Sequence, residues 1–180
     1  MMGAAPIGVL LCMVALSAVP ARGQAGPGLP PGATTDPALA RIELGDVLRF
    51  AAAARAAEST ADTLLWIQQA YLDPGSAGLR AWSERYRMTA WTLRTALRRE
   101  PAVYANPQAL IDSLRRYEPA IRTGLERLRE LFPAAVYPPT WFLIGAREAG
   151  GLTRPEGVLI AAERFVERPA DVVPLVLHEM

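Results

Sequence analysis

The feature that most constrains the fold is a change in hydrophobic pattern near Pro133. Before it, apolar residues recur at helical spacing, and after it they form short runs separated by prolines and glycines. Spacings of three and four residues place side chains on one face of a helix, whereas short runs of β-branched and aromatic residues are typical of strands. The pattern predicts an α+β fold that is mostly α, with a helical N-terminal part and β structure near the C-terminal end.

Two helices are expected in residues 36–72. The first begins at Asp36-Pro37, a capping side chain followed by a residue whose φ suits the first helical position, and patchy helix extends from there to about Ser59. The second begins near Thr60 and ends before the turn at residues 73–75. One face of the second helix carries Leu64, Ile67 and Tyr71.

Two longer helices are expected between Ser76 and Phe132. The third helix opens at Ser76 and ends at Pro101. Its expected buried stripe is Leu79, Trp82, Tyr86, Leu93 and Leu97. The fourth covers residues 108–132, and Pro119 is expected to kink or break it because proline removes a helical hydrogen bond. Its inner face carries Leu110, Leu114, Leu125, Leu128 and Leu131. These residues at helical spacing are interpreted as core, not as a cofactor site.

The C-terminal part is expected to contain a short β-hairpin and a final helix. Residues 141–145 and 158–160 are apolar and rich in strand formers, and residues 148–155 between them are interpreted as a Gly-rich turn. The segment 167–171 then breaks the pattern. Asp171 is the expected start of the last helix, where Pro174 is tolerated in the first turn.

The N-terminus has the layout of a secretory signal peptide. Residues 7–19 form an apolar stretch too short to span a bilayer comfortably, and small residues Ala21 and Gly23 precede an expected cleavage before Gln24. No Lys or Arg precedes the apolar stretch, which departs from the usual signal. We expect a signal peptide at residues 1–23, a Pro/Gly-rich linker at 24–36, and a domain at 37–180 in an exported protein, periplasmic or extracellular.

Composition excludes several classes of partner. Of the 180 residues, 51% are hydrophobic and 21% charged, which is typical of a globular chain, and the formal net charge is only +1. This charge balance predicts no nucleic-acid partner, and contact with a membrane only through the signal segment if it stays uncleaved. Cys12, the single cysteine, falls inside the signal, so no disulfide is expected in the mature protein.

The end of the chain carries the residues with the clearest chemistry. The only histidine, His178, is followed by Glu179 after an apolar run. In the helical motif His-Glu-x-x-His, two imidazoles four residues apart reach one zinc ion, and the glutamate takes a proton from zinc-bound water. Here the sequence reads His-Glu-Met, and the second histidine would fall two residues beyond Met180.

Several motifs in order resemble a family of predicted exported zinc-dependent proteases, catalogued first as a domain of unknown function and placed near the gluzincins. The matching pieces are Gly75-Ser76 with Gly78-Leu79, residues 138–145, Gly150-Gly151, residues 157–163, and His178-Glu179. The resemblance covers about Asp36 to Met180. It implies a zincin-type active-site helix near the C-terminal end. The given sequence stops within the His-Glu-x-x-His motif of that helix.

The resemblance implies His178 as first zinc ligand, Glu179 as general base, and a peptide or protein substrate. With the second histidine and any third ligand missing, the chain is interpreted as the N-terminal fragment of a zinc metallopeptidase. It is expected to bind Zn²⁺ only weakly and to be inactive as given, because catalytic zinc wants three protein ligands. Glu163 matches a family position of unassigned role, for which a strand-end carboxylate that caps or pairs with an arginine is the plainer interpretation.

Two other functions stay open. The chain is alternatively a secreted helical binding or structural domain with no metal. In a third reading, the apolar N-terminus is an uncleaved anchor, and the helices form a membrane-tethered interaction domain.

Overall fold

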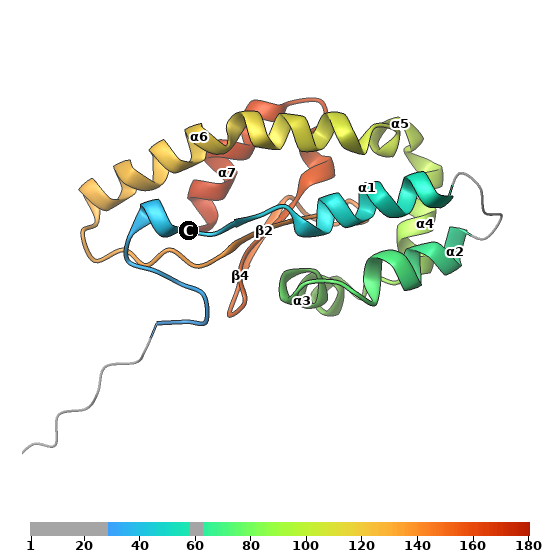
Figure 1. The fold of residues 1–180 in the computed structure, drawn as a ribbon, viewed down its shortest axis with the longest axis horizontal. Helices are drawn as coiled ribbons and strands as arrows, with labels where there is room; N and C mark the ends of the chain where they lie inside the picture. The colour runs from blue at the N-terminus through green and yellow to red at the C-terminus, as the bar shows by residue number, and fades with distance from the viewer. Residues whose placement is uncertain (1–28, 58–62) are drawn as a thin grey trace, which may run out of the picture.

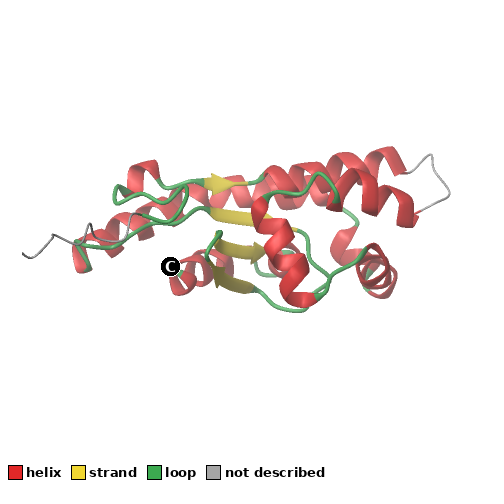
Figure 2. Ribbon diagram, turned by 90° about the horizontal axis from the view of Figure 1, so that it is seen from below, coloured by secondary structure: helices red, strands yellow, loops and turns green. Residues whose placement is uncertain are grey.

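A small sheet surrounded by helices forms the part of the chain that the computed structural model describes, residues 29–57 and 63–180 (Figure 1, Figure 2). The α+β, mostly α fold expected from the sequence is confirmed. The expected signal peptide at residues 1–23, with Cys12, and the first part of the expected linker lie outside the described residues. Within the described ranges, no helix has the length and apolar character needed to cross a membrane.

The segment after Asp36 is less regular than the expected first helix. The Asp36 side chain caps only a 3₁₀ helix, η1 (Pro37–Leu39). A short strand, β1 (Ile42–Glu43), follows and pairs with the sheet before helix α1 (Gly45–Ala57) begins. The prediction of one helix from residue 36 is therefore wrong over residues 40–44, because pairing with a distant strand outweighs the local helix preference there.

The expected second helix is present, but it changes from an α-helix to a π-helix along its length. The expected start near Thr60 lies outside the described residues, which resume with α2 (Thr63–Trp66) and continue directly into the π-helix η2 (Ile67–Leu72). The expected inner face is confirmed for the buried Ile67 and Tyr71, and Leu64 packs against the core while partly exposed.

The expected third helix is two helices. α3 (Ala77–Tyr86) starts at Ser76, whose hydroxyl oxygen accepts the backbone N–H three residues later at 3.1 Å, so the predicted start is confirmed. The chain then leaves the helix at Arg87, which adopts a left-handed conformation with φ 52°. Thr89 begins α4 (Ala90–Arg99) with a capping box. The predicted continuous helix to Pro101 is therefore wrong, because a cap in the middle of it competes successfully with the helical pattern.

The fourth expected helix has the predicted length but is less interrupted than predicted. After the single turn α5 (Pro101–Tyr104), α6 (Pro107–Leu131) runs through Pro119 without a break. Buried leucines and isoleucines on both sides of Pro119 hold the helix together: Leu110, Ile111, Leu114, Ile121 and Leu125. Leu131 is 62% exposed, so its prediction as an inner-face residue is wrong.

The sheet has the strand order β1-β2-β4-β3. β2 (Thr140–Leu143) and β4 (Gly157–Ala161) are parallel neighbours, and β3 (Gly151–Arg154) pairs antiparallel with β4 at the sheet edge. The predicted hairpin of the two apolar runs is therefore wrong. The segment interpreted as a turn contains β3 itself, which lets the chain reverse twice and places the two buried runs side by side in parallel.

A tight connection between β3 and β4 depends on Gly157. This residue has φ 132°, and a Cβ built on it would lie 2.1 Å from the carbonyl oxygen of Pro139. That oxygen accepts the backbone N–H of Val158 at 2.9 Å and so joins β4 to the entry of β2. Only glycine fits this conformation and this close approach.

Helices lie on both faces of the sheet. On one face, Gly78 of α3 lies directly against the Trp141 side chain of β2. On the other, Gly151 of β3 lies against the Glu179 side chain of α7 (Val172–Glu179), and α6 packs behind α7 (Figure 1). The C-terminal helix is thus held between the long helix and the sheet edge.

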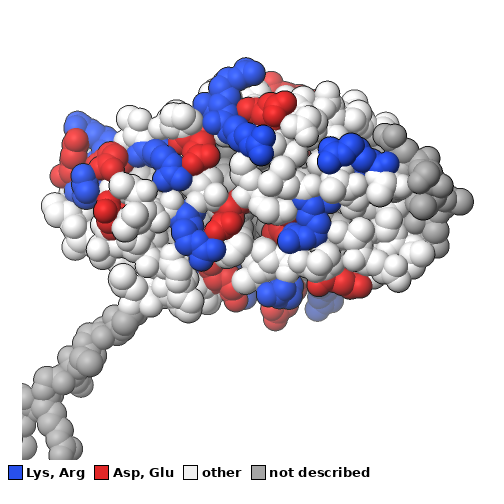
Figure 3. Space-filling view, in the orientation of Figure 1, with Lys and Arg blue, Asp and Glu red and all other residues white. Residues whose placement is uncertain are grey.

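The arginines are spread over a mixed-charge surface, as the sequence suggests. Figure 3 shows basic and acidic side chains interspersed on the face in view. Along α6 the ion pairs are Glu118–Arg122, Glu126–Arg129 and Arg127–Glu130. Exposed pairs of this kind contribute at most about 1 kcal/mol each.

Candidate functional site

The helix that carries the expected site residues begins where the sequence suggests. Asp171 stands at the start of α7, although its side chain makes no capping hydrogen bond, and Pro174 lies in the first turn. The helix buries Val172 and Val176. Its close contact with α6 requires Gly124, where a Cβ would meet a methyl carbon of the Leu177 side chain at 2.5 Å.

His178 and Glu179 lie in the last turn of α7 with different surroundings. His178 is exposed, and Glu179 is partly buried against the edge strand. The Thr153 hydroxyl lies 2.5 Å from the Glu179 carbonyl oxygen and 3.0 Å from its Oε2. A Cβ at Gly151 would come within 3.0 Å of the Glu179 Cγ, so the strand has no side chain where the glutamate lies. The Glu179 carboxylate is therefore positioned along β3.

The residues present do not complete a catalytic zinc site. His178 offers one nitrogen ligand, and a catalytic zinc ion takes three protein ligands. Across residues 29–57 and 63–180, no group of three or more His, Cys, Asp and Glu side chains is placed to hold a metal ion.

Glu163 lies away from α7, in the 3₁₀ helix η3 (Ala162–Phe165) that follows β4. Its fully buried carboxylate accepts the backbone N–H of Gly145 at 3.0 Å and that of Arg147 at 3.3 Å. The interpretation of Glu163 as a strand-end cap is thus confirmed. The nearby guanidinium of Arg147 donates instead to the Glu163 carbonyl oxygen (3.4 Å) and pairs with Glu100 (3.0 Å).

Burial is the largest influence on the pKa of Glu163. It raises the pKa of this carboxyl from its ordinary 4.5 to about 7, against the lowering effect of the hydrogen bonds from backbone N–H groups. The exposed carboxylate of Glu148 raises it further. A carboxyl that titrates near neutral pH is suited to exchange a proton with its surroundings.

Two buried tyrosines complete this end of β2, and sequence reasoning placed neither at a polar site. The Tyr71 hydroxyl donates to Ile144 O at 2.7 Å and accepts Ile144 N–H at 2.8 Å. The Tyr104 hydroxyl donates to Gly145 O at 3.2 Å. Burial raises the pKa of Tyr71 well above its ordinary value, and it raises the pKa of Tyr104 as well. A tyrosine on an apolar helix face carries no local signal of such a bond.

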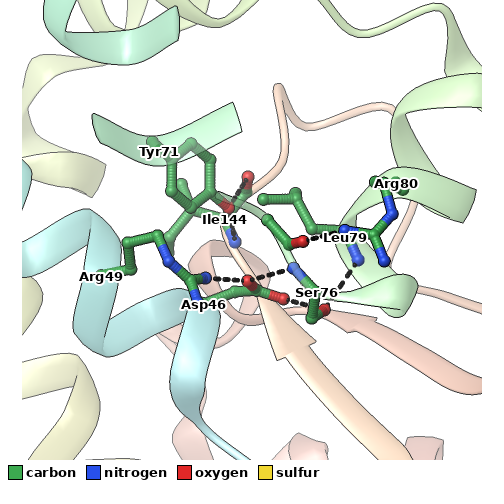
Figure 4. Close-up of polar contacts among 8 residues, drawn as sticks. Asp46, Arg49, Tyr71, Ser76, Leu79, Arg80 and Ile144 are labelled. Atoms are coloured by element: carbon green, nitrogen blue, oxygen red, sulfur yellow. Dashed lines mark hydrogen bonds and ion pairs between the residues drawn. The ribbon is translucent and has the colours of Figure 1, made fainter. Parts of the chain in front are cut away.

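A second polar cluster joins the starts of α1 and α3 (Figure 4). The buried Asp46 carboxylate accepts the Ser76 N–H at 3.1 Å and the Ser76 hydroxyl at 2.5 Å, and it also pairs with Arg49. Ser76 Oγ in turn accepts the Leu79 N–H. The arrangement has a serine and an aspartate without a histidine between them, so it lacks the base that would activate a nucleophile. It fixes two helix ends instead.

This cluster gives physical reasons for part of the Gly-Ser-x-Gly-Leu stretch. A Cβ at Gly75 would come within 2.9 Å of Leu72 O, and one at Gly78 within 2.4 Å of Trp141 Cγ. Both glycines permit close packing, and Ser76 provides the cap. Asp46, the partner of Ser76, lies 30 positions away, where the sequence offers no signal of the pairing.

Comparison with known protein-family models, with curated proteins and with solved structures found no match.

Proposed function

We propose that this chain contributes the first metal ligand and the general base of an exported zinc-dependent peptidase. His178 is the ligand, Glu179 the base, and the substrate is a peptide or protein. The observation that supports this most is the position of Glu179: its side chain lies along an edge strand, over Gly151 and beside Thr153. Zinc peptidases place their active-site helix beside a strand in this way.

The chemistry assigned to this chain is a proton transfer. When bound, the zinc ion would polarise the attacking water and the scissile carbonyl. Glu179 would accept the proton of that water and return it to the leaving amine. Glu179 is partly buried, and the Thr153 hydroxyl holds its carboxylate near the strand.

The proposal needs ligands that the described residues do not supply. It requires a histidine two positions after Met180, one helical turn beyond His178, and a further ligand from elsewhere. By the same reasoning, we expect peptidase activity only from a protein that supplies these further ligands.

The test begins with the DNA that follows codon 180. If it encodes one residue and then histidine, the extended protein is expressed and assayed for zinc content and peptide hydrolysis. Glu179→Gln should lower the rate by about a hundredfold or more while zinc content is kept, because the base contributes to catalysis and not to binding. Glu167→Gln, at an exposed position outside α7, is the matched control and should leave the rate unchanged.

The alternative, a secreted helical binding or structural domain without metal, makes the opposite prediction. A stop codon after Met180, together with a melting temperature that zinc does not change, would favour it. Full activity of Glu179→Gln in an extended protein would also remove the peptidase mechanism proposed here.

A further inference from the structure

The loop between β2 and β3 is bound to carboxylates through three successive backbone N–H groups. Gly145 N–H donates to Glu163 Oε2 at 3.0 Å, Ala146 N–H to Glu148 Oε2 at 3.0 Å, and Arg147 N–H to Glu163 Oε1 at 3.3 Å. Arg147 has φ 67°, in the left-handed region that non-glycine residues rarely adopt. Successive N–H groups around such a residue form a concavity that binds anions.

Glu163 is the fixed member of this arrangement. It is fully buried on η3, whereas Glu148 belongs to the loop itself and is exposed. Among the described residues, the Glu163 carboxylate has no ion pair. The loop therefore covers a carboxylate that only backbone dipoles stabilise.

The other charged or titratable groups around Glu163 do not neutralise it. The hydroxyls of Tyr71 on η2 and Tyr104 on α5 bond to backbone atoms of residues 144 and 145. The Arg147 guanidinium donates to the Glu163 carbonyl oxygen at 3.4 Å and pairs with Glu100, at the end of α4, so it does not bond to the Glu163 carboxylate. Glu148 adds a second negative charge nearby.

The indole of Trp82 on α3 lies beside the same part of the loop. A Cβ built on Gly145 would lie 3.0 Å from Trp82 Nε1 and 3.1 Å from Glu163 Oε1. The indole and the carboxylate thus approach Gly145 together. Water can reach the carboxylate most directly if the loop moves.

We propose that Glu163 is a pH-responsive latch: its ionisation favours opening of the β2–β3 loop, and its protonation favours the closed loop. In the closed loop the charge is buried without a cation, whereas in the open loop water solvates it. Proton binding from solvent removes that charge. The acid form keeps a carbonyl oxygen to accept an N–H, such as that of Gly145.

The direction follows from linkage between protonation and opening. Burial raises the pKa of Glu163 to about 7 when the loop is closed, and a solvated carboxyl has the ordinary value of 4.5. The open fraction therefore rises as pH increases from about 4.5 and levels off above about 7. Between pH ~5 and pH ~8 the equilibrium constant for opening should increase by up to about a hundredfold.

The latch goes beyond the proposed peptidase function and does not depend on it. The loop leads directly into β3, whose Gly151 and Thr153 contact Glu179. Opening the loop would therefore loosen the strand beside the proposed base. The latch itself is testable in this chain without zinc.

Amide hydrogen exchange of the isotope-labelled protein, read by NMR between pH 5 and 8, tests the latch. Rates are divided by the intrinsic rate at each pH to give protection factors. Protection of the Gly145 and Arg147 amides should fall by up to about a hundredfold with rising pH, and low denaturant should not alter this because the opening is local. Protection that stays constant or increases with pH would overturn the proposal.

Two variants complete the test. Glu163→Gln cannot ionise, so the pH dependence at these two amides should disappear. Glu148→Gln removes a charge that raises the pKa of Glu163, so the response should persist with a smaller amplitude. If Glu163→Gln does not fold, the wild type and Glu148→Gln still decide: complete loss of the response in Glu148→Gln would show that Glu148, and not Glu163, is the group responsible.

Discussion

Replacing Gly157 by alanine tests the arrangement of the sheet most directly. The new methyl group would lie 2.1 Å from Pro139 O, and the residue would have to keep φ 132°, where an L-residue is strained. Because Pro139 O also accepts the Val158 N–H, the backbone cannot move away without loosening the contact between β4 and the start of β2.

The expected cost has two parts. A non-glycine residue held in such a conformation costs about 1–3 kcal/mol. The overlap with a backbone oxygen adds a similar amount, since overpacking costs about 1–3 kcal/mol. We therefore expect Gly157→Ala to lower the free energy of unfolding by about 3–5 kcal/mol, a large fraction of the stability of a domain this size.

Gly45→Ala is the matched control, with the same chemical change. A Cβ at Gly45 meets nothing within 4 Å, and this glycine lies at the first position of α1. Alanine there should stabilise the protein by about 0.5–1 kcal/mol, because it reduces the conformational entropy of the unfolded chain.

Urea unfolding followed by tryptophan fluorescence measures both variants, since Trp82 is buried in the core. The midpoints should move in opposite directions with the slopes unchanged. A Gly157→Ala variant within about 1 kcal/mol of wild type would refute the tight β3–β4 connection and the parallel placement of β2 and β4.

Three further outcomes are expected. The free energy of unfolding should fall by about 3 kcal/mol as pH rises from about 4.5 to about 7, because the Glu163 pKa is raised in the folded protein. Denaturation curves at several pH values measure this decrease, and Glu163→Gln should not show it. Asp46→Ala should cost about 2–3 kcal/mol by urea unfolding, because Ser76 loses a buried acceptor, whereas truncating exposed Asp112 in the same way should cost little. On expression in an exporting host, the mature protein should begin at Gln24, and mass spectrometry that finds the uncleaved chain would contradict the signal peptide.

Local signals determined the features whose partners are close in sequence. The start of α3 at Ser76 and the buried face of α6 could be read directly, because caps and helical faces are made by residues three or four positions apart. The start of the last helix after Asp171 is a local feature of the same kind. So does the order of His178 and Glu179, from which the candidate site was named.

Features that depend on distant partners could not be predicted in this way. Strand β3 is interpreted as a turn from the sequence because its four residues begin with Gly151, after Gly150, and are followed by Pro155, a pattern that looks like a loop until β4 lies beside it. The buried role of Asp46 depends on Ser76, and the raised pKa of Glu163 on a loop that folds over it. For Asp46 and Glu163 the partners lie 30 and 16–18 positions away, too far along the chain to leave a periodic pattern.

The sequence by itself determined that the chain is mostly helical, which side chains of several helices lie in the core, and that an apolar run leads to His178 and Glu179, for which the roles of ligand and base are proposed. Tertiary structure decided the parallel order of the strands, the position of Glu179 on the sheet edge and the burial of Glu163. The physical reason is that helices and caps are formed by neighbours in the chain. Sheet order and the burial of charge arise only when distant segments pack and exclude water.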